Sequence, residues 1–264
     1  MCKDCGCSGH HHAHDDHGHE HHHHHDEHWH SHDGGKTFHS HHDTAAHAAP
    51  VRKVPLAKAV LADNDADAAA NRQWFAERGI TAYNLISSPG SGKTALLVET
   101  LKKLDIPAAV IVGDPYGEYD ADRLRATGAP VTQIQVHESC HLSARQVGEV
   151  LESAIPAGTK IVFIENVGNL VCPVAFDLGE QAKVALLSTP EGEEKPLKYP
   201  ALFAAAELVL ITKFDLGAVL DWNCSICIKN INQVNPDVQT MCISTKTEEG
   251  FSGWIEFLKN KINK

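Results

Sequence analysis

The feature that constrains this fold most is a short glycine-containing run, Ser87-Ser88-Pro89-Gly90-Ser91-Gly92-Lys93-Thr94. An apolar segment at residues 83–87 leads into it, and an amphipathic segment at residues 94–104 follows. Such a run between a strand and a helix surrounds phosphates with backbone N–H groups, and its lysine and hydroxyl reach the terminal phosphate and its metal ion. The sequence therefore predicts a phosphate-binding loop. Ser87 departs from the general pattern, which has glycine there.

The remainder of the chain after residue 50 alternates between apolar and amphipathic segments. Strands are expected at residues 83–87, 108–112, 131–136, 160–164, 184–187, 208–212 and 238–243. Helices are expected at residues 58–78, 94–104, 121–126, 143–153, 216–233 and 251–261. This alternation favours an α/β domain over residues 50–264, with a mainly parallel sheet flanked by helices on both faces.

The first 49 residues have a different composition. They hold 18 of the chain's 20 histidines, behind a cysteine cluster at Cys2, Cys5 and Cys7. No packed core absorbs that density of imidazole, which is a good ligand for nickel, zinc and copper. We expect a cysteine metal site at residues 1–9 and a disordered metal-storage tail at residues 10–49. Three thiolates and an amine suit planar Ni²⁺ better than tetrahedral Zn²⁺.

Charge and hydropathy argue against two classes of partner. The net charge is −11 with histidine counted as neutral, which disfavours a basic nucleic-acid-binding surface. The sequence contains no run of 18 apolar residues and no signal-peptide core. We therefore expect a cytoplasmic protein without a membrane partner. Its eight cysteines should be reduced there and available as metal ligands.

Three further residues extend the predicted phosphate site. Glu165 and Asp114 each follow an apolar strand, and α/β sheets bind ligands at the carboxyl ends of their strands. Each carboxylate can hold Mg²⁺ beside Thr94, directly or through water. Gly168 can sense the γ-phosphate as a switch glycine, whereas Asp120 is expected to cap the next helix. No glutamine stands in an obvious place to orient water, so we expect slow hydrolysis.

A later segment favours guanine over adenine. The Asp215 carboxylate can accept hydrogen bonds from the N1–H and 2-amino groups of guanine, which adenine lacks. Lys213 would pack its stem over the base. The usual leading asparagine of this motif is Thr212 here, and a simple helix cap is the alternative role for Asp215.

We therefore expect GTP and Mg²⁺. The expected nucleotide site consists of Ser88, Gly90, Ser91, Gly92, Lys93, Thr94, Ala95, Gly168, Lys213, Asp215, Ser244 and Lys246. The expected catalytic residues are Lys93, Thr94, Asp114 and Glu165, of which Thr94 and Glu165 would hold the Mg²⁺ ion.

A second metal site is predicted at the same end of the sheet. Cys140 and His141 are adjacent between a strand and a helix, and Cys172 follows Glu165 by seven residues. Two thiolates and an imidazole suit nickel or zinc, and the path from Gly168 to Cys172 would link this site to the γ-phosphate. For each cysteine, burial as a small apolar side chain is the alternative.

Residues 2–7, 87–94, 113–114, 120–129, 140–144 and, most specifically, 164–173 resemble the hydrogenase nickel-insertion GTPases of the HypB family. The resemblance implies a P-loop NTPase of the SIMIBI type of G domain. It also implies a tight nickel site at Cys2, Cys5 and Cys7, and a second site at Cys140, His141 and Cys172 near a dimer interface.

The same resemblance implies that GTP favours a homodimer. Hydrolysis would then be coupled to nickel insertion into the [NiFe]-hydrogenase large-subunit precursor, with the help of a HypA-like nickel chaperone. Three alternatives remain open: a nickel or zinc storage and buffering protein with a weak nucleotide site, a urease-type nickel-delivery GTPase, and a zinc-trafficking GTPase. Cys224 and Cys227 fall outside the family pattern, and their shared helical stripe favours core packing.

Overall fold

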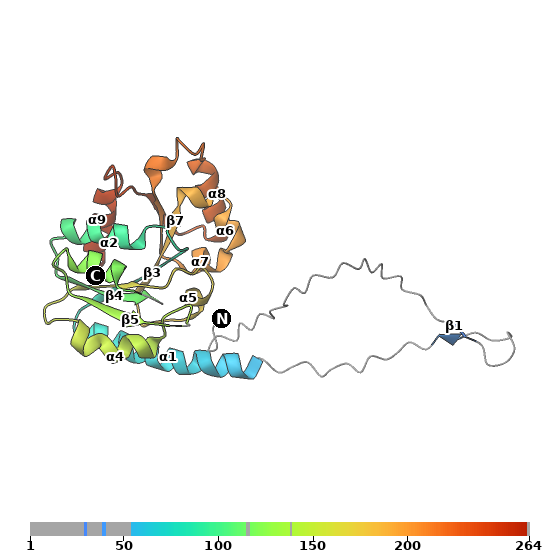
Figure 1. The fold of residues 1–264 in the computed structure, drawn as a ribbon, viewed down its shortest axis with the longest axis horizontal. Coiled ribbons are helices and arrows are strands. Elements are labelled where there is room, and N and C mark those ends of the chain that lie inside the picture. Colours follow the sequence, from blue (N-terminus) through green and yellow to red (C-terminus); the bar gives the residue numbers. More distant parts are fainter. Residues whose placement is uncertain (1–28, 31–38, 41–53, 115–116, 138, 263–264) are drawn as a thin grey trace.

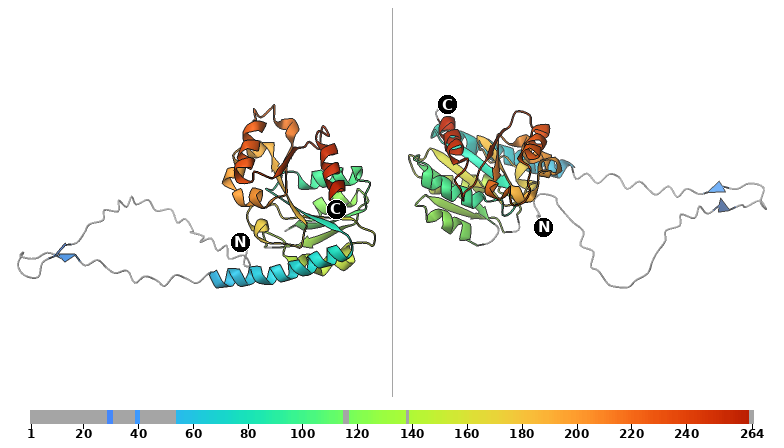
Figure 2. Two further views of the ribbon diagram at one scale, coloured as in Figure 1. Left: turned by 180° about the vertical axis from the view of Figure 1, so that it is seen from behind. Right: turned by 90° about the horizontal axis from the view of Figure 1, so that it is seen from above.

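The computed structural model describes residues 29–30, 39–40, 54–114, 117–137 and 139–262. Its main element is a parallel sheet of seven strands with helices on both faces (Figures 1 and 2). The strand order is β5-β4-β6-β3-β7-β8-β9, so β3 lies in the middle of the sheet. The predicted fold class is therefore confirmed.

The strands agree with the predicted segments to within two residues at each end. They are β3 (Thr81–Ser87), β4 (Ala108–Asp114), β5 (Val131–Gln135), β6 (Ile161–Glu165), β7 (Ala182–Ser188), β8 (Leu208–Thr212) and β9 (Gln239–Cys242). The helices of eight or more residues are α1 (Val54–Glu77), α2 (Lys93–Lys103), α4 (Ala144–Ala154), α8 (Cys224–Val234) and α9 (Phe251–Ile262). The shorter helices are α3 (Tyr119–Arg125), α5 (Cys172–Ala175), η1 (Thr189–Glu191), α6 (Lys195–Lys198), α7 (Pro200–Ala205) and η2 (Phe214–Leu216).

The two faces of the sheet carry separate cores. Odd-numbered positions of β3 such as Tyr83 and Leu85 pack with α2, α3 and α9, where Trp254 is fully buried. Even-numbered positions such as Ala82 and Ile86 face α1 and α4 on one half of the sheet and α7 and α8 on the other. This alternation follows from the two-residue period of a strand. Because β3 is buried on both faces, the loop at its carboxyl end is held rigidly.

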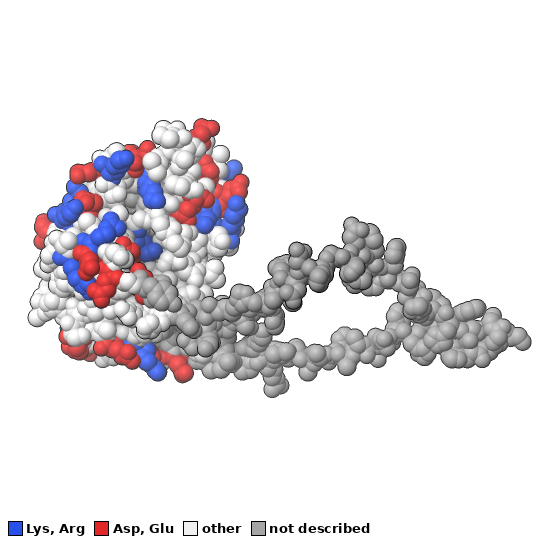
Figure 3. Space-filling view, in the orientation of Figure 1, with Lys and Arg blue, Asp and Glu red and all other residues white. Residues whose placement is uncertain are grey.

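Acidic side chains gather along the lower edge of the molecule in Figure 3, where α1 and α4 lie in Figure 1. Elsewhere on that face, basic and acidic side chains alternate, and no broad basic patch is visible. This distribution agrees with the acidic net charge. None of the helices in the described part of the chain has the length and hydrophobicity needed to cross a membrane.

The helix predicted at residues 216–233 is wrong in its first half. The chain forms η2 and then turns, and α8 begins only at Cys224. Asn223 causes this late start, since its side chain accepts a hydrogen bond from Ile226 N at 3.1 Å and caps the helix. Cys227 is fully buried, as predicted from the helical stripe, but Cys224 is only partly buried.

Three short helices, α5, α6 and α7, were not predicted. Each has a proline in its first turn, at Pro173, Pro196 and Pro200. Proline is favoured there because its fixed φ suits the helix and its missing N–H has no helical partner to lose. Segments of four to six residues are too short to show a helical period.

The predictions for residues 1–9 and for most of residues 10–49 lie outside the described residues. The described exceptions are β1 (Trp29–His30) and β2 (His39–Ser40). These two strands pair antiparallel, with Trp29 opposite Ser40, a pairing that the sequence did not predict.

Candidate functional site

The phosphate-binding loop joins the central strand β3 to α2. Gly92 precedes the first residue of α2 with φ of 96°, a left-handed conformation that glycine adopts without strain. The loop opens into a cavity of about 440 Å³. Of the predicted site residues, the cavity is lined by Gly90, Gly92, Lys93, Thr94, Ala95, Asp114, Glu165 and Gly168. The first turn of α2 thus faces a space that suits an anion.

Lys93 lies in this cavity and contacts the residue that departs from the general motif. Its Nζ donates a hydrogen bond to Ser87 Oγ at 3.0 Å. Burial lowers the pKa of Lys93, although the Glu165 carboxylate opposes that shift. Ser87 therefore gives the lysine an acceptor that the usual glycine would not supply.

Thr94 and Glu165 form a buried pair at the carboxyl end of β6. Thr94 Oγ1 donates to Glu165 Oε1 at 2.7 Å. Burial raises the pKa of Glu165 to about 7, against the effect of Lys93. Among the described residues, Glu165 Oε2 is buried without a hydrogen-bond partner. A hydroxyl and a carboxylate with an unused oxygen fit a Mg²⁺ ion, which prefers oxygen ligands.

Two aspartates face the same cavity from β4 and α3. Asp114 is the last residue of β4, as the magnesium prediction requires. Asp120 was expected to cap a helix starting at residue 121, and this is wrong. The helix α3 begins at Tyr119 with Glu118 at its N-cap, so Asp120 lies in the first turn and lines the cavity. Its Oδ1 is 3.4 Å from Arg123 Nη1.

Gly168 lies against the phosphate-binding loop. A Cβ atom added to it would approach Pro89 Cα to 2.9 Å, closer than atoms normally pack. Only glycine therefore allows the segment after β6 to come this close to the loop. The position suits a residue that moves with the nucleotide's terminal phosphate.

The predicted base residues lie together outside the phosphate cavity. Asp215 Oδ1 accepts a hydrogen bond from Ser244 Oγ at 2.6 Å. Ser244 Oγ in turn accepts from Lys246 N at 3.1 Å. Lys213, with φ of 55°, occupies the N-cap of η2, so Asp215 is not its cap and the alternative role as a helix cap is wrong.

Thr212 stands where the guanine motif usually has asparagine, and it contacts the phosphate-binding loop. Its Oγ1 donates to Ser91 O at 2.6 Å, and the residue is buried. This bond ties β8 directly to the loop after β3. The substitution therefore keeps a connection between the base segment and the phosphate segment.

Glu191 is a residue of this site that the sequence analysis missed. Its Oε2 accepts hydrogen bonds from Ser91 Oγ at 2.7 Å and from Ser188 Oγ at 2.8 Å. Burial alone would raise the pKa of Glu191, but hydrogen bonds from serines, including Ser88, hold it below its usual value. Ser88 and Ser91 thus support the loop from outside the cavity. The sequence does show a capping box, Ser188 followed three residues later by Glu191, but that pattern signals a helix start and not a contact with Ser91.

The predicted inner metal residues lie on two adjoining segments. Cys140 Sγ is 3.7 Å from His141 Nδ1, and the His141 ring stacks on Phe176 with centroids 3.8 Å apart. Cys172 begins α5 and is partly buried. Within the described part of the chain, no three His, Cys, Asp or Glu side chains are arranged to hold a metal ion. The structure thus brings Cys140 and His141 together but does not complete the predicted set with Cys172.

Two hydrogen bonds connect this metal segment to the residues after Glu165. Leu142 N donates to Asn166 Oδ1 at 3.2 Å, and Asn169 Nδ2 donates to Cys140 O at 3.4 Å. Asn166 is fully buried and directly follows Glu165. These bonds connect the segment after β6 to the backbone on both sides of His141.

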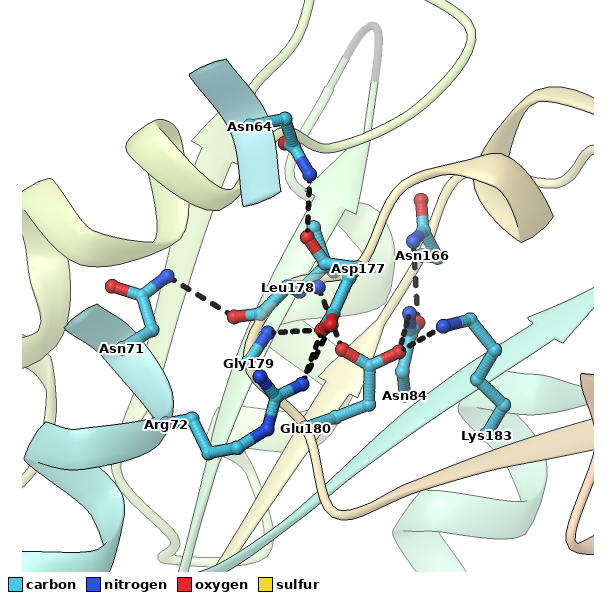
Figure 4. Close-up of polar contacts among 10 residues, drawn as sticks. All are labelled: Asn64, Asn71, Arg72, Asn84, Asn166, Asp177, Leu178, Gly179, Glu180 and Lys183. Atoms are coloured by element: carbon cyan, nitrogen blue, oxygen red, sulfur yellow. Dashed lines mark hydrogen bonds and ion pairs between the residues drawn. The ribbon is translucent and has the colours of Figure 1, made fainter. Parts of the chain in front are cut away.

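Asn166 belongs to a larger buried network, drawn in Figure 4. Asn166 Nδ2 donates to Asn84 Oδ1 at 3.2 Å, and Asn84 Nδ2 donates to Glu180 Oε1 at 3.2 Å. Lys183 Nζ forms an ion pair with Glu180 Oε1 at 2.7 Å and is the last member of this network. Every polar side chain in this hydrogen-bonded series has a partner, which favours a single arrangement of β3, β7 and the segment after β6.

The helix α1 is fixed to the same region by two asparagines. Asn71 Nδ2 donates to Ala144 O at 2.7 Å and to Leu178 O at 3.0 Å. Asn64 Nδ2 donates to Asp177 O at 2.8 Å (Figure 4). The helix that follows the histidine-rich segment is thus anchored beside the start of α4, three residues after His141.

Comparison with known proteins places the chain among nucleotide-binding proteins. A family model described as the CobW/HypB/UreG nucleotide-binding domain matches residues 81–241. The hydrogenase maturation factor HypB of Rhizobium leguminosarum bv. viciae is 50% identical over 210 residues, which are 78% of this chain and 70% of that protein. The hydrogenase/urease maturation factor HypB of Helicobacter pylori is 34% identical over 214 residues, 80% of this chain and 88% of that protein.

Solved structures agree with these relatives. The crystal structure of HypB from Helicobacter pylori in complex with nickel gives a TM-score of 0.73 at 34% identity, and covers 76% of this chain and 95% of that one. HypB from Archaeoglobus fulgidus gives a TM-score of 0.72 at 32% identity, and covers 76% of this chain and 100% of that one.

The parallel sheet, the phosphate-binding loop and the family match define a nucleotide-binding domain of the CobW/HypB/UreG class. Within that class the chain belongs to the HypB family of hydrogenase maturation factors. The family resemblance predicted from residues 164–173 is confirmed.

Proposed function

We propose that this protein is a GTPase that couples GTP hydrolysis to insertion of nickel into the [NiFe]-hydrogenase large-subunit precursor. The observation that carries the proposal is the pair of hydrogen bonds that join Asn166 and Asn169, in the segment after Glu165, to the Cys140–Leu142 segment. A nucleotide-dependent movement at Gly168 would reach the metal residues through these bonds. The nickel-bound HypB structure of Helicobacter pylori supports nickel as the metal.

In this proposal each part of the cavity has a defined task. The backbone N–H groups of residues 90–95 and the Lys93 ammonium bind the phosphates. Thr94 and Glu165 would hold Mg²⁺, with Asp114 contacting it directly or through water, and the ion supplies charge stabilisation for phosphoryl transfer. Asp215 and Lys213 would bind guanine, beside Ser244 and Lys246.

We further propose that nickel uses two kinds of site. Cys2, Cys5 and Cys7 form a tight site, and the histidines of residues 10–49 store additional ions. The inner site forms when Cys172 approaches Cys140 and His141, in a homodimer that GTP favours. Zn²⁺ is the competing ion at the inner site, because thiolate and imidazole also suit it.

The family resemblance implies two protein partners for this chain. They are a HypA-like nickel chaperone and the hydrogenase large-subunit precursor, both expected in the cytoplasm. The high identity to hydrogenase maturation factors favours this role over urease-type delivery.

The test is mant-GTP and mant-ATP titration of the full-length protein with Mg²⁺, followed by phosphate release. We expect GTP to bind more tightly than ATP, Asp215→Ala to reduce that preference, and Lys93→Ala to abolish slow GTP hydrolysis. If wild type does not bind mant-GTP at physiological nucleotide concentrations, the protein is instead a metal storage and buffering protein.

A further inference from the structure

A pair of cysteine thiols lies beside the predicted base site. Cys224 is the first residue of α8 and Cys242 is the last residue of β9. Their sulfur atoms are 3.6 Å apart, although the residues are 18 positions apart in the sequence. Both side chains are partly exposed, so a small reagent can reach them.

The two cysteines stand at the ends of the segments that carry the base residues. Lys213 and Asp215 lead through residues 217–223 to Cys224, and Cys242 is followed two residues later by Ser244. The segments already meet at the Ser244 to Asp215 hydrogen bond of 2.6 Å. Phe214 N also donates to Ile243 O at 3.3 Å.

We propose that Cys224 and Cys242 form a reversible disulfide that fastens these two base-binding segments to each other. A disulfide requires sulfur atoms about 2.05 Å apart, so the two atoms, now 3.6 Å apart, must approach by roughly 1.5 Å. The inference about the bond is independent of the proposed function, whereas its effect on nucleotide release rests on the predicted base site.

The backbone around Cys242 is held in place, so a bond there acts on the loop. A Cβ atom on Gly250 would overlap the Cys242 carbonyl oxygen, and Ser244 N donates to Glu249 O at 3.0 Å. The loop of residues 244–250 therefore closes directly onto Cys242. Cross-linking Cys242 to α8 restricts how far this loop can open, and a base held between the two segments should leave more slowly.

The chemistry is thiol–disulfide exchange with a low-molecular-weight disulfide such as glutathione disulfide. The Cys224 thiolate attacks one sulfur of the reagent, its S–S bond breaks, and one glutathione thiolate leaves. Cys242 then loses its proton to solvent and attacks the Cys224 sulfur, which releases the second glutathione thiolate. Two protein thiols are oxidised by two electrons, and one glutathione disulfide is reduced to two glutathione thiols.

The order of attack follows from position. Cys224 is the first residue of an eleven-residue helix and is partly exposed, so it attacks the reagent first. Burial and the neighbouring Cys224 raise the pKa of Cys242 to about 12, so Cys242 is the resolving thiol. Cys227 is fully buried, and burial raises its pKa to about 12 as well, which makes it a matched control.

Peptide mapping tests the bond in the full-length protein. Metal-stripped, reduced protein is treated with glutathione disulfide, quenched with N-ethylmaleimide and digested with trypsin. Cleavage after Lys213, Lys229 and Lys246 places Cys224 and Cys242 in separate peptides, 214–229 and 230–246. We expect these peptides to be linked in wild type and Cys227→Ser, unlinked in Cys224→Ser and Cys242→Ser, and separated again by dithiothreitol.

Release of mant-GDP then tests the consequence. Oxidation should slow release about threefold or more in wild type and Cys227→Ser, because the bond preorganises the bound arrangement. Cys224→Ser retains every other cysteine and should show no such slowing. Absence of the linked peptides, or linkage that requires Cys227, overturns the proposal. Linked peptides without slower mant-GDP release would overturn the effect on nucleotide release but not the bond. The peptide mapping does not depend on nucleotide binding, so it tests the bond even if the proposed function fails.

Discussion

At the scale of single residues, the buried Glu165 carboxylate sets the electrostatics of the phosphate cavity. Its pKa of about 7 arises mainly from burial, which disfavours the charged form. Only the ionised carboxylate binds Mg²⁺ well. Near neutral pH the residue therefore responds both to pH and to the metal ion.

This leads to a prediction about magnesium. Between pH 6 and pH 7 the Mg²⁺ affinity of the GTP complex should rise by up to about tenfold, because a raised carboxyl pKa leaves Glu165 mostly protonated at the lower pH. The rise should level off above pH 7. Mant-GTP fluorescence during Mg²⁺ titration measures the affinity. Glu165→Gln is the control, because glutamine does not titrate and any remaining pH dependence comes from the nucleotide. An identical pH profile of Mg²⁺ affinity in wild type and Glu165→Gln would contradict the role of Glu165.

A second prediction concerns Thr212. In Thr212→Val the hydroxyl bonded to Ser91 O is lost with little change in shape. We expect a loss of about 1–2 kcal/mol in the free energy of unfolding, since a buried carbonyl loses its partner. Urea unfolding compares this variant with wild type and with Thr212→Ser, which keeps the hydroxyl but loses a buried methyl group. Stability of Thr212→Val equal to that of wild type would show that this bond contributes nothing.

The motif fixes both residue type and spacing, so the sequence correctly placed Gly92, Lys93 and Thr94 at a strand-to-helix junction that lines one cavity. Their role in binding a nucleotide stays a prediction. The sequence analysis missed Glu191 and Asn166, because their hydrogen-bond partners are distant in the chain. Glu191 binds Ser91, 100 positions away, and Asn166 binds Leu142, 24 positions away. No local pattern records such contacts. The capping box at Ser188 signals a helix start and says nothing of Ser91.

At the scale of elements, α1 is held to the domain by specific hydrogen bonds as well as by apolar packing. Phe75 on this helix is fully buried, and Asn71 bonds to α4 and to the loop before β7. The long strands and helices were predictable from apolar periodicity. The break at residues 217–223 was not predictable, because the apolar pattern continues through these residues. The cap that Asn223 supplies leaves no trace in apolar periodicity.

The anchoring of α1 gives a third prediction. Asn71→Ala should lower the free energy of unfolding by about 2 kcal/mol, because two hydrogen bonds to Ala144 and Leu178 are lost in a buried setting. Gln73→Ala on the same helix removes only an exposed bond to Glu77 and should cost less than about 0.5 kcal/mol. Urea unfolding compares the two. A similar loss in both variants would contradict the anchoring role of Asn71.

At the scale of the whole molecule, three parts follow one another along the chain: a histidine-rich segment, an anchoring helix and a nucleotide-binding domain. The α/β class of that domain was predictable, since alternation of strands and helices leaves few topologies. The separation of Cys172 from the Cys140–His141 pair was not predictable from the sequence, because the approach of two loops depends on packing far from both loops.

The proposed function requires the nucleotide and nickel sites to be energetically coupled through residues 165–172. The most direct measurement is the affinity for mant-labelled, non-hydrolysable GTP in excess Mg²⁺, with and without Ni²⁺, in full-length wild type, in Cys140→Ala/Cys172→Ala and in the control Cys227→Ala. The tail is the same in all three proteins. We expect Ni²⁺ to change the nucleotide affinity about fivefold or more in wild type and Cys227→Ala, and to leave that of the double variant unchanged. An equal effect of Ni²⁺ in all three proteins, or none in wild type, would contradict this coupling.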